Sequence, residues 1–262
     1  MTHRMLFMGG CHVTGFHIDP AQAFPAVLSR QLGSTLVGQL PHIAFAHLPA
    51  HLARLASLAP TQVVFQLGNY ECTASGRLLL QRLLPAAAAK WVAPAGAATG
   101  GPATGGPAQC LRIAGAGVLN AALWCAAPRF RRSLRALNAC MRQHPATAFV
   151  FLAPFPCRPA ADNAMRRFGG WLLRHRLARL PNVHWVDTHA LLPVAAPLFA
   201  DPWHLNAAGH QLVAGGVADC LRAAAGSREG RRTSVPSFPG RVVSDADAVV
   251  PAILRKRSGL DL

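Results

Sequence analysis

Short apolar runs alternate along most of the chain with longer segments of helical spacing. Each run ends near a turn-forming residue, which predicts a buried strand. The predicted strands are Met5–Gly9, Thr35–Leu40, Gln62–Leu67, Ala146–Ala153 and Val183–Asp187. Apolar residues three and four positions apart predict helices in the segments between and after them. The predicted helices are Pro20–Leu32, Leu48–Leu58, Phe130–Arg142, Asn163–Leu180 and Ala207–Ala225.

Strands that alternate with helices predict an α/β fold in which a parallel sheet is covered on both faces. The expected architecture is a three-layer α/β/α sandwich with a five-stranded parallel sheet, formed by residues 1–225. In an open sheet of this kind, ligands bind at the carboxyl ends of the strands. The loops after the strands are therefore where we expect functional residues.

Two segments do not fit this core. Residues 94–107 include the run Gly100–Pro107, which is rich in glycine and proline and predicts a flexible insertion. This insertion is either a tolerated linker or a lid, and nothing in it is chemically active. From Gly226 onward charge, Ser, Pro and Gly rise together, so residues 226–262 are predicted to form a basic, disordered tail.

Composition narrows the class of protein. The chain has 262 residues of which 52% are hydrophobic, enough to bury a sizeable core. No apolar run approaches the roughly 20 residues of a membrane span, and the N-terminal residues lack a secretory pattern, so we expect a cytoplasmic protein with no membrane span. The net charge of +16 raises nucleic acid as a partner, but the arginine-rich segment 129–135 has helical spacing and no interleaved aromatic residues. A solvated helix face is the simpler interpretation.

Candidate metal ligands are few in the sequence. The 7 cysteines show no paired spacing, and most are expected to be reduced and buried. His47 and His51 lie one helical turn apart, with His42 nearby, but no carboxylate or cysteine accompanies them. We interpret these histidines as a helix surface, and we expect no metal and no cofactor.

Cys11 follows the first predicted strand in the turn Gly9-Gly10-Cys11-His12. The glycines allow a tight turn that leaves Cys11 at the start of a helical segment. The positive end of a helix and a nearby imidazole both favour the thiolate, which is the form that attacks electrophiles. His12 either tunes this thiol or points away into the next helix. Cys11 is therefore the candidate nucleophile.

Two further loops carry candidate catalytic groups. Asn69 follows the third predicted strand, where its amide would donate to a developing oxyanion. Asp201 and His204 lie three residues apart just before the last predicted helix, so the carboxylate is able to orient one nitrogen of the imidazole. Trp203, between them, either lines an acyl pocket or packs over that helix. Together the three loops supply a nucleophile, an oxyanion donor and an oriented base.

The order and surroundings of these loops resemble the SGNH, or GDSL-type, hydrolase superfamily over roughly residues 5–225. The segment Asp201–His210 is similar to its last block, D-x-x-H-x-N followed by a helix. Phe7–Gly15 resembles the first block, and Leu67–Glu71 resembles the G-x-N-D block. The resemblance implies a flavodoxin-like sheet and a catalytic Asp-x-x-His near the C-terminus.

The chain also departs from the pattern of that family. Cys11 stands where the family has its nucleophilic Ser, and Gly10 where it has Asp. The resemblance implies an oxyanion hole formed by the Cys11 N–H, the Asn69 side chain and a second-block glycine, for which Gly38 is the nearest candidate. We expect hydrolysis or transfer of an acyl group from a small ester or thioester. The alternative is an inactive SGNH-like domain retained for ligand binding or assembly.

Overall fold

The computed structural model describes residues 3–69, 71–72, 111, 115, 128–177, 179–194 and 197–230. The chain divides into two compact units, Met1–Ala224 and Ala225–Leu262. The account below concerns the first unit, and of the second only the end of the last helix is described. The predicted insertion at 94–107 and the part of the predicted tail beyond Gly230 lie outside the described residues.

Five parallel strands form one sheet in the order β2-β1-β3-β4-β5. The strands are β1 (Arg4–Gly9), β2 (Thr35–Leu40), β3 (Gln62–Gln66), β4 (Ala148–Leu152) and β5 (Val183–Val186). The predicted five-stranded parallel sheet is confirmed, with strand ends that differ from the predicted ones by two residues or fewer. Successive crossovers place β1 and β3 at the centre, so Cys11 follows a central strand.

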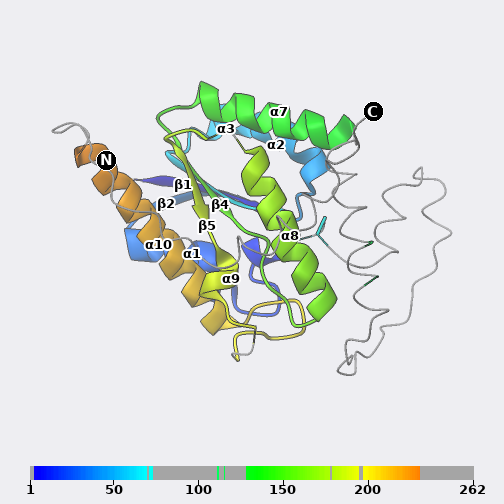
Figure 1. The fold of residues 1–262 in the computed structure, drawn as a ribbon. Helices are drawn as coiled ribbons and strands as arrows, with labels where there is room; N and C mark the ends of the chain where they lie inside the picture. Colours follow the sequence, from blue (N-terminus) through cyan, green and yellow to red (C-terminus); the bar gives the residue numbers. More distant parts are fainter. Residues whose placement is uncertain are drawn as a thin grey trace, which may run out of the picture. The chain divides into compact units, whose positions relative to one another are not determined.

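Helices cover both faces of the sheet (Figure 1). The helices are α1 (Phe24–Leu32), α2 (Leu48–Leu52), α3 (Arg54–Leu58), α7 (Pro128–Gln143), α8 (Ala160–Arg176), α9 (Thr188–Leu191) and α10 (Ala207–Gly230). Short 3-10 helices are η1 (Cys11–Val13), η2 (Pro20–Gln22) and η3 (Phe45–His47). The sheet and its two helical layers form the expected three-layer sandwich.

Alternation along the strands determines which helices cover which face. In β1, Met5 and Phe7 pack in the cluster that includes residues of α1 and α10, whereas Leu6 and Met8 pack in the cluster that includes residues of α2, α3, α7 and α8. All four side chains are fully buried. Burial of an aliphatic or aromatic side chain contributes roughly 1.5–3 kcal/mol, so both faces of this strand stabilise the sheet.

Four predicted helices differ in the structure, by three residues or more at one end or by a break within the helix. The predicted helix Asn163–Leu180 is observed as α8, which begins at Ala160 and ends at Arg176. The segment Leu48–Leu58 forms two short helices, α2 and α3, that meet at Ala53. The segment Pro20–Leu32 begins as the 3-10 helix η2, capped by the Asp19 side chain, before α1 starts at Phe24. The last helix continues to Gly230, into the segment predicted to be a tail. In the described ranges, no helix has both the length and the apolar character needed to cross a membrane.

The carboxyl ends of β1 and β3 approach each other closely. A Cβ atom added to Gly9 would lie 2.4 Å from the carbonyl oxygen of Gln66, so only glycine fits there. The N–H of the next residue, Gly10, donates to the side chain of Gln66 at 2.8 Å and to its carbonyl oxygen at 3.2 Å. These contacts fix the turn that leads into Cys11.

Candidate active site

Cys11 begins the 3-10 helix η1 directly after this turn. Because it stands at the start of the helix, its own N–H has no partner within the helix and is available to another acceptor. The thiol is free and half-buried. The side chain of Thr14 donates to the carbonyl oxygen of Cys11 at 2.9 Å, which holds the short helix in place.

Asp201 organises the loop before α10 with both of its carboxylate oxygens. Oδ1 accepts hydrogen bonds from the N–H groups of Trp203 and His204, each at 2.7 Å. Oδ2 lies 2.6 Å from Nδ1 of His204. The three-residue spacing therefore places the imidazole against the carboxylate, and the two backbone bonds keep the carboxylate in that position.

Asp201 and His204 each favour the charged form of the other. Partial burial disfavours the charged carboxylate of Asp201, but hydrogen bonds from the His204 ring and from the N–H groups of Trp203 and His204 lower its pKa below the usual value. A hydrogen bond with Cys11 is the largest cause that raises the pKa of His204, and Asp201 adds to it, while burial opposes it. Since Nδ1 of His204 faces Asp201, its Nε2 is the nitrogen left for Cys11.

Asn69 lies on the loop after β3. Its Oδ1 accepts the N–H of Phe155 at 2.8 Å, which fixes the amide plane. Its Nδ2 is buried and has no hydrogen-bond partner in the part of the chain that the structure describes. Gly68 precedes it with φ of 94°, and a Cβ atom there would lie 2.9 Å from the Pro154 ring. An orphaned buried donor is what an oxyanion site requires, because substrate then supplies the missing acceptor.

Gly38 does not lie with the other candidate residues. It is within β2, opposite Leu6 of β1, and the strand continues to Leu40 before the loop at the carboxyl end begins. A Cβ atom at Gly38 would lie 3.1 Å from the Leu6 side chain, so the small residue serves the close approach of two elements in the sandwich. Its place within β2, two residues before the carboxyl end of the strand, therefore gives no support to the predicted role as an oxyanion donor.

His12 points towards Cys11 and is nearly inaccessible to solvent, at 2% exposed. Its Nδ1 lies 3.7 Å from the Cys11 sulfur, and its Nε2 accepts the N–H of Leu205 at 3.4 Å. Burial is the largest cause that lowers the pKa of His12 well below its usual value, followed by the neighbouring His210. The alternative in which His12 points away from Cys11 is therefore wrong, and the ring is neutral near pH 7.

Trp203 and the three histidines at positions 42, 47 and 51 were further candidates in the sequence. Trp203 is 43% exposed, and its indole N–H donates to Asp162 of α8 at 3.4 Å. In the described residues, the ligand atoms of His42, His47 and His51 do not converge as a metal site.

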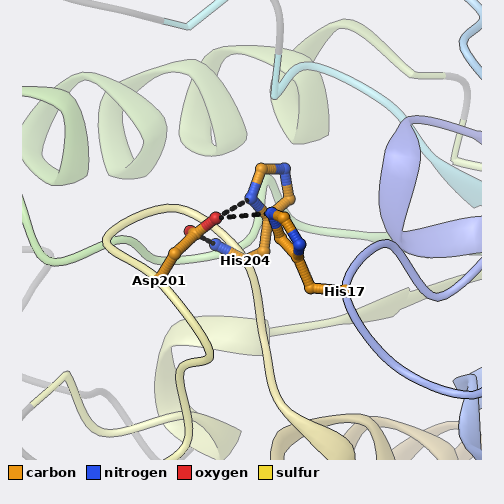
Figure 2. Close-up of side chains that lie close together, drawn as sticks. All are labelled: His17, Asp201 and His204. Atoms are coloured by element: carbon orange, nitrogen blue, oxygen red, sulfur yellow. Dashed lines mark hydrogen bonds and ion pairs between the residues drawn. The ribbon is translucent and has the colours of Figure 1, made fainter. Parts of the chain in front are cut away.

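His17 is a member of the site that the sequence interpretation missed. Its Nε2 lies 3.2 Å from Oδ2 of Asp201, the same oxygen that contacts His204. Figure 2 shows the two imidazoles meeting at this carboxylate, His17 from the loop after η1 and His204 from the loop before α10. No sequence signal marks His17, because its contact with Asp201 joins two loops far apart in the chain.

Comparison with known proteins identifies relatives in fold alone. No family model matches the sequence, and no curated protein matches it. A protein assigned to the lipolytic G-D-S-L family from Desulfitobacterium hafniense is 13% identical with a TM-score of 0.52, over 84% of this chain and 100% of that one. A carbohydrate esterase family 2 enzyme from Corynascus thermopiles is 14% identical with a TM-score of 0.50, over 86% of this chain and 67% of that one. The chain therefore has the α/β fold of the G-D-S-L hydrolases.

Proposed function

We propose that this protein is an SGNH-type acyl hydrolase or acyltransferase in which Cys11, His204 and Asp201 form a catalytic triad. The observation that carries the proposal is the position of His204, whose Nδ1 lies 2.6 Å from Oδ2 of Asp201. The Cys11 side chain, acting with Asp201, raises the pKa of this imidazole, which supports a pairing of the two groups. Small esters and thioesters are the proposed substrates. The fold shared with G-D-S-L proteins supports the reaction class.

In the proposed reaction, Nε2 of His204 takes the proton of the Cys11 thiol, and the thiolate attacks the acyl carbon. The Cys11 N–H and Nδ2 of Asn69 donate to the oxyanion that forms. Collapse of the tetrahedral intermediate expels the alcohol or thiol, which receives its proton from His204. The acyl-thioester on Cys11 is then attacked by water or an acceptor, which His204 deprotonates, and the thiol of Cys11 is restored.

The alternative is an inactive domain that keeps the fold for binding or assembly. Two features favour an enzyme over it. Nδ2 of Asn69 is buried with no partner among the described residues, and Asp201 holds the imidazole of His204 in one orientation. Leaving a buried donor unsatisfied costs roughly 1–3 kcal/mol, so a domain with no chemistry would be more stable without it.

Mass spectrometry of the purified full chain tests the proposal. The protein is incubated with short-chain acyl thioesters and esters, and separately with iodoacetamide, and the labelled cysteine is identified by peptide mapping. We expect Cys11 to be acylated and alkylated faster than every other cysteine, and both rates to fall in His204→Ala. Cys220→Ala is the matched control, because Cys220 is also free and half-buried but lies on α10. An inert Cys11 would leave the inactive-domain alternative.

A further inference from the structure

A second arrangement of ligands overlaps the proposed triad. One ligand atom from each of His17, Asp201 and His204 lies within 4.8 Å of the other two. Two imidazoles and a carboxylate are a ligand set that zinc and similar ions bind readily. His17 itself is on the surface, with its side chain 51% exposed, so an ion reaches this cluster from solvent.

The distances fit a tetrahedral ion with little rearrangement. Zinc lies about 2.0–2.2 Å from imidazole nitrogen and carboxylate oxygen, which puts neighbouring ligand atoms of a tetrahedron about 3.3 Å apart. Nε2 of His17 is already 3.2 Å from Oδ2 of Asp201. Nδ1 of His204 is 2.6 Å from that oxygen and would have to move outward as its hydrogen bond is exchanged for the ion. Water would complete the coordination.

We propose that a divalent transition-metal ion of the zinc class binds to His17, Asp201 and His204 and thereby inhibits the enzyme. The ion is an inhibitor in this proposal, and the acyl-transfer reaction needs none. Binding of the ion is independent of the proposed function, whereas inhibition rests on it.

The inhibition follows from the two nitrogens of one ring. An ion on Nδ1 of His204 uses the lone pair there, so a neutral ring carries its proton on Nε2. Nε2 is the nitrogen that has to accept the Cys11 proton, and it has no lone pair left in this tautomer. The ion also replaces the bond from Asp201 that orients the ring. Metal binding and catalysis are therefore mutually exclusive.

Calorimetric titration of the full chain with zinc, after dialysis against a chelator, measures binding. We expect one ion per chain at this site. His17→Ala should lower the affinity for zinc roughly tenfold or more. Removing a residue that only hydrogen-bonds to a metal ligand already costs about that much, and His17 would be a ligand itself. Cobalt substitution gives a second readout, because tetrahedral cobalt with nitrogen and oxygen ligands has a characteristic visible absorption. His47→Ala is the control, since His47 and His51 lie four residues apart and away from the proposed ligands in the sequence.

Two results would overturn the proposal. One is binding that His17→Ala leaves unchanged and His47→Ala removes, which assigns the ion to the helix surface. The other is zinc binding that is lost in Cys11→Ala and unchanged in His17→Ala, which assigns the ion to the thiol. The inhibition is measured as the ratio of activity with and without zinc for each variant. If zinc binds through His17 but the protein acylates nothing, the proposed function fails and the metal site stands.

Discussion

Nδ1 of His12 lies 3.7 Å from the sulfur of Cys11, while Nε2 of the same ring accepts the N–H of Leu205 at 3.4 Å. One buried ring therefore connects the loop of Cys11 with the loop of His204. When Nε2 accepts from Leu205, a neutral ring carries its proton on Nδ1, where it donates to a thiolate. We interpret His12 as a positioning residue for Cys11.

Two substitutions separate the contacts of His12. Asn keeps a polar group near the position of Nδ1, and Gln keeps one near Nε2. We expect His12→Gln to lower kcat/KM by roughly 10- to 100-fold, the value of one hydrogen bond to a charged group, and to slow alkylation of Cys11 at fixed pH. His12→Asn should keep most of the activity. Equal losses in both variants, tracking a lower Tm, would mean that the ring serves packing alone.

Asp201→Asn tests the orientation of His204. The Oδ1 atom of Asn still accepts the N–H groups of Trp203 and His204, so the loop should keep its shape. The NH₂ group of Asn takes the place of Oδ2 and cannot accept the proton on Nδ1 of His204. We therefore expect kcat to fall by roughly 10²- to 10⁴-fold, as in other triads. Asp219→Asn, which breaks the exposed pair with Arg222, is the control and should be neutral. Activity retained in Asp201→Asn would remove Asp201 from the mechanism.

Asn69→Asp changes the proposed oxyanion donor while preserving its shape. The acceptor for the N–H of Phe155 remains, and the donor Nδ2 becomes an oxygen. We expect kcat to fall by roughly 10²- to 10³-fold with a smaller effect on KM, because a donor of this kind acts in the transition state. Steady-state kinetics measures kcat and KM, and thermal unfolding of the same variant shows whether a loss of activity comes from a loss of stability. A rise in KM alone would make Asn69 a substrate-binding residue.

Cys11→Ser tests the substrate class. A thioester transfers its acyl group to Cys11 by exchanging one carbon–sulfur bond for another, whereas an ester must form a more reactive thioester from a more stable bond. We expect the natural chain to favour a thioester over the ester of the same acid, and the Ser variant to lose that preference. Competition assays with the two substrates give the ratio of kcat/KM directly. An unchanged ratio would show that the preference does not come from the nucleophile.

Stability should fall in mild acid because of His210. This side chain is fully buried, its Nδ1 accepts the N–H of Phe24 at 3.0 Å, and burial lowers its pKa to about 4. The unfolded chain takes up that proton near pH 6.5, so the stabilisation is complete above pH 6.5 and is lost as pH falls towards 4. Between pH 7 and 5 this amounts to about 2 kcal/mol.

Urea unfolding at the two pH values measures this loss. His210→Gln keeps an acceptor for Phe24 but does not titrate, so its free energy of unfolding should fall less between pH 7 and 5. His175→Gln, on the exposed face of α8, should behave like the natural chain. Equal pH dependence in all three proteins would assign the acid sensitivity to other groups.

Much of the fold was predictable because strand burial leaves a direct trace in the sequence. The strands Gln62–Gln66 and Ala148–Leu152 are buried along their whole length, as the apolar runs Val63–Phe65 and Ala148–Leu152 within them predict. The short helix α9 was missed, although Asp187 marks its start by accepting the N–H groups of His189 and Ala190. A four-residue helix has too few turns to show a periodic pattern.

The site was predictable where spacing within one loop decides the geometry. The contact between Asp201 and His204 follows from their three-residue separation, while their roles, with those of Cys11 and Asn69, stay predictions. Side-chain direction was not predictable for His12, because adjacency to Cys11 does not determine rotamers. His17 was out of reach for a different reason: its contact joins two loops that only the folded sheet brings together.

The bond from Leu205 to His12 spans 193 positions of the chain. During synthesis, Cys11 emerges long before the loop of His204, so folding of the N-terminal part cannot supply the base of the proposed triad. Contacts of such long range form late, because the entropy of closing the loop between them must be overcome first. In the proposed mechanism, the thiol of the nascent chain has no base beside it, and Cys11 gains its reactivity when the fold is complete. The rate at which Cys11 gains reactivity during refolding reports that final docking step.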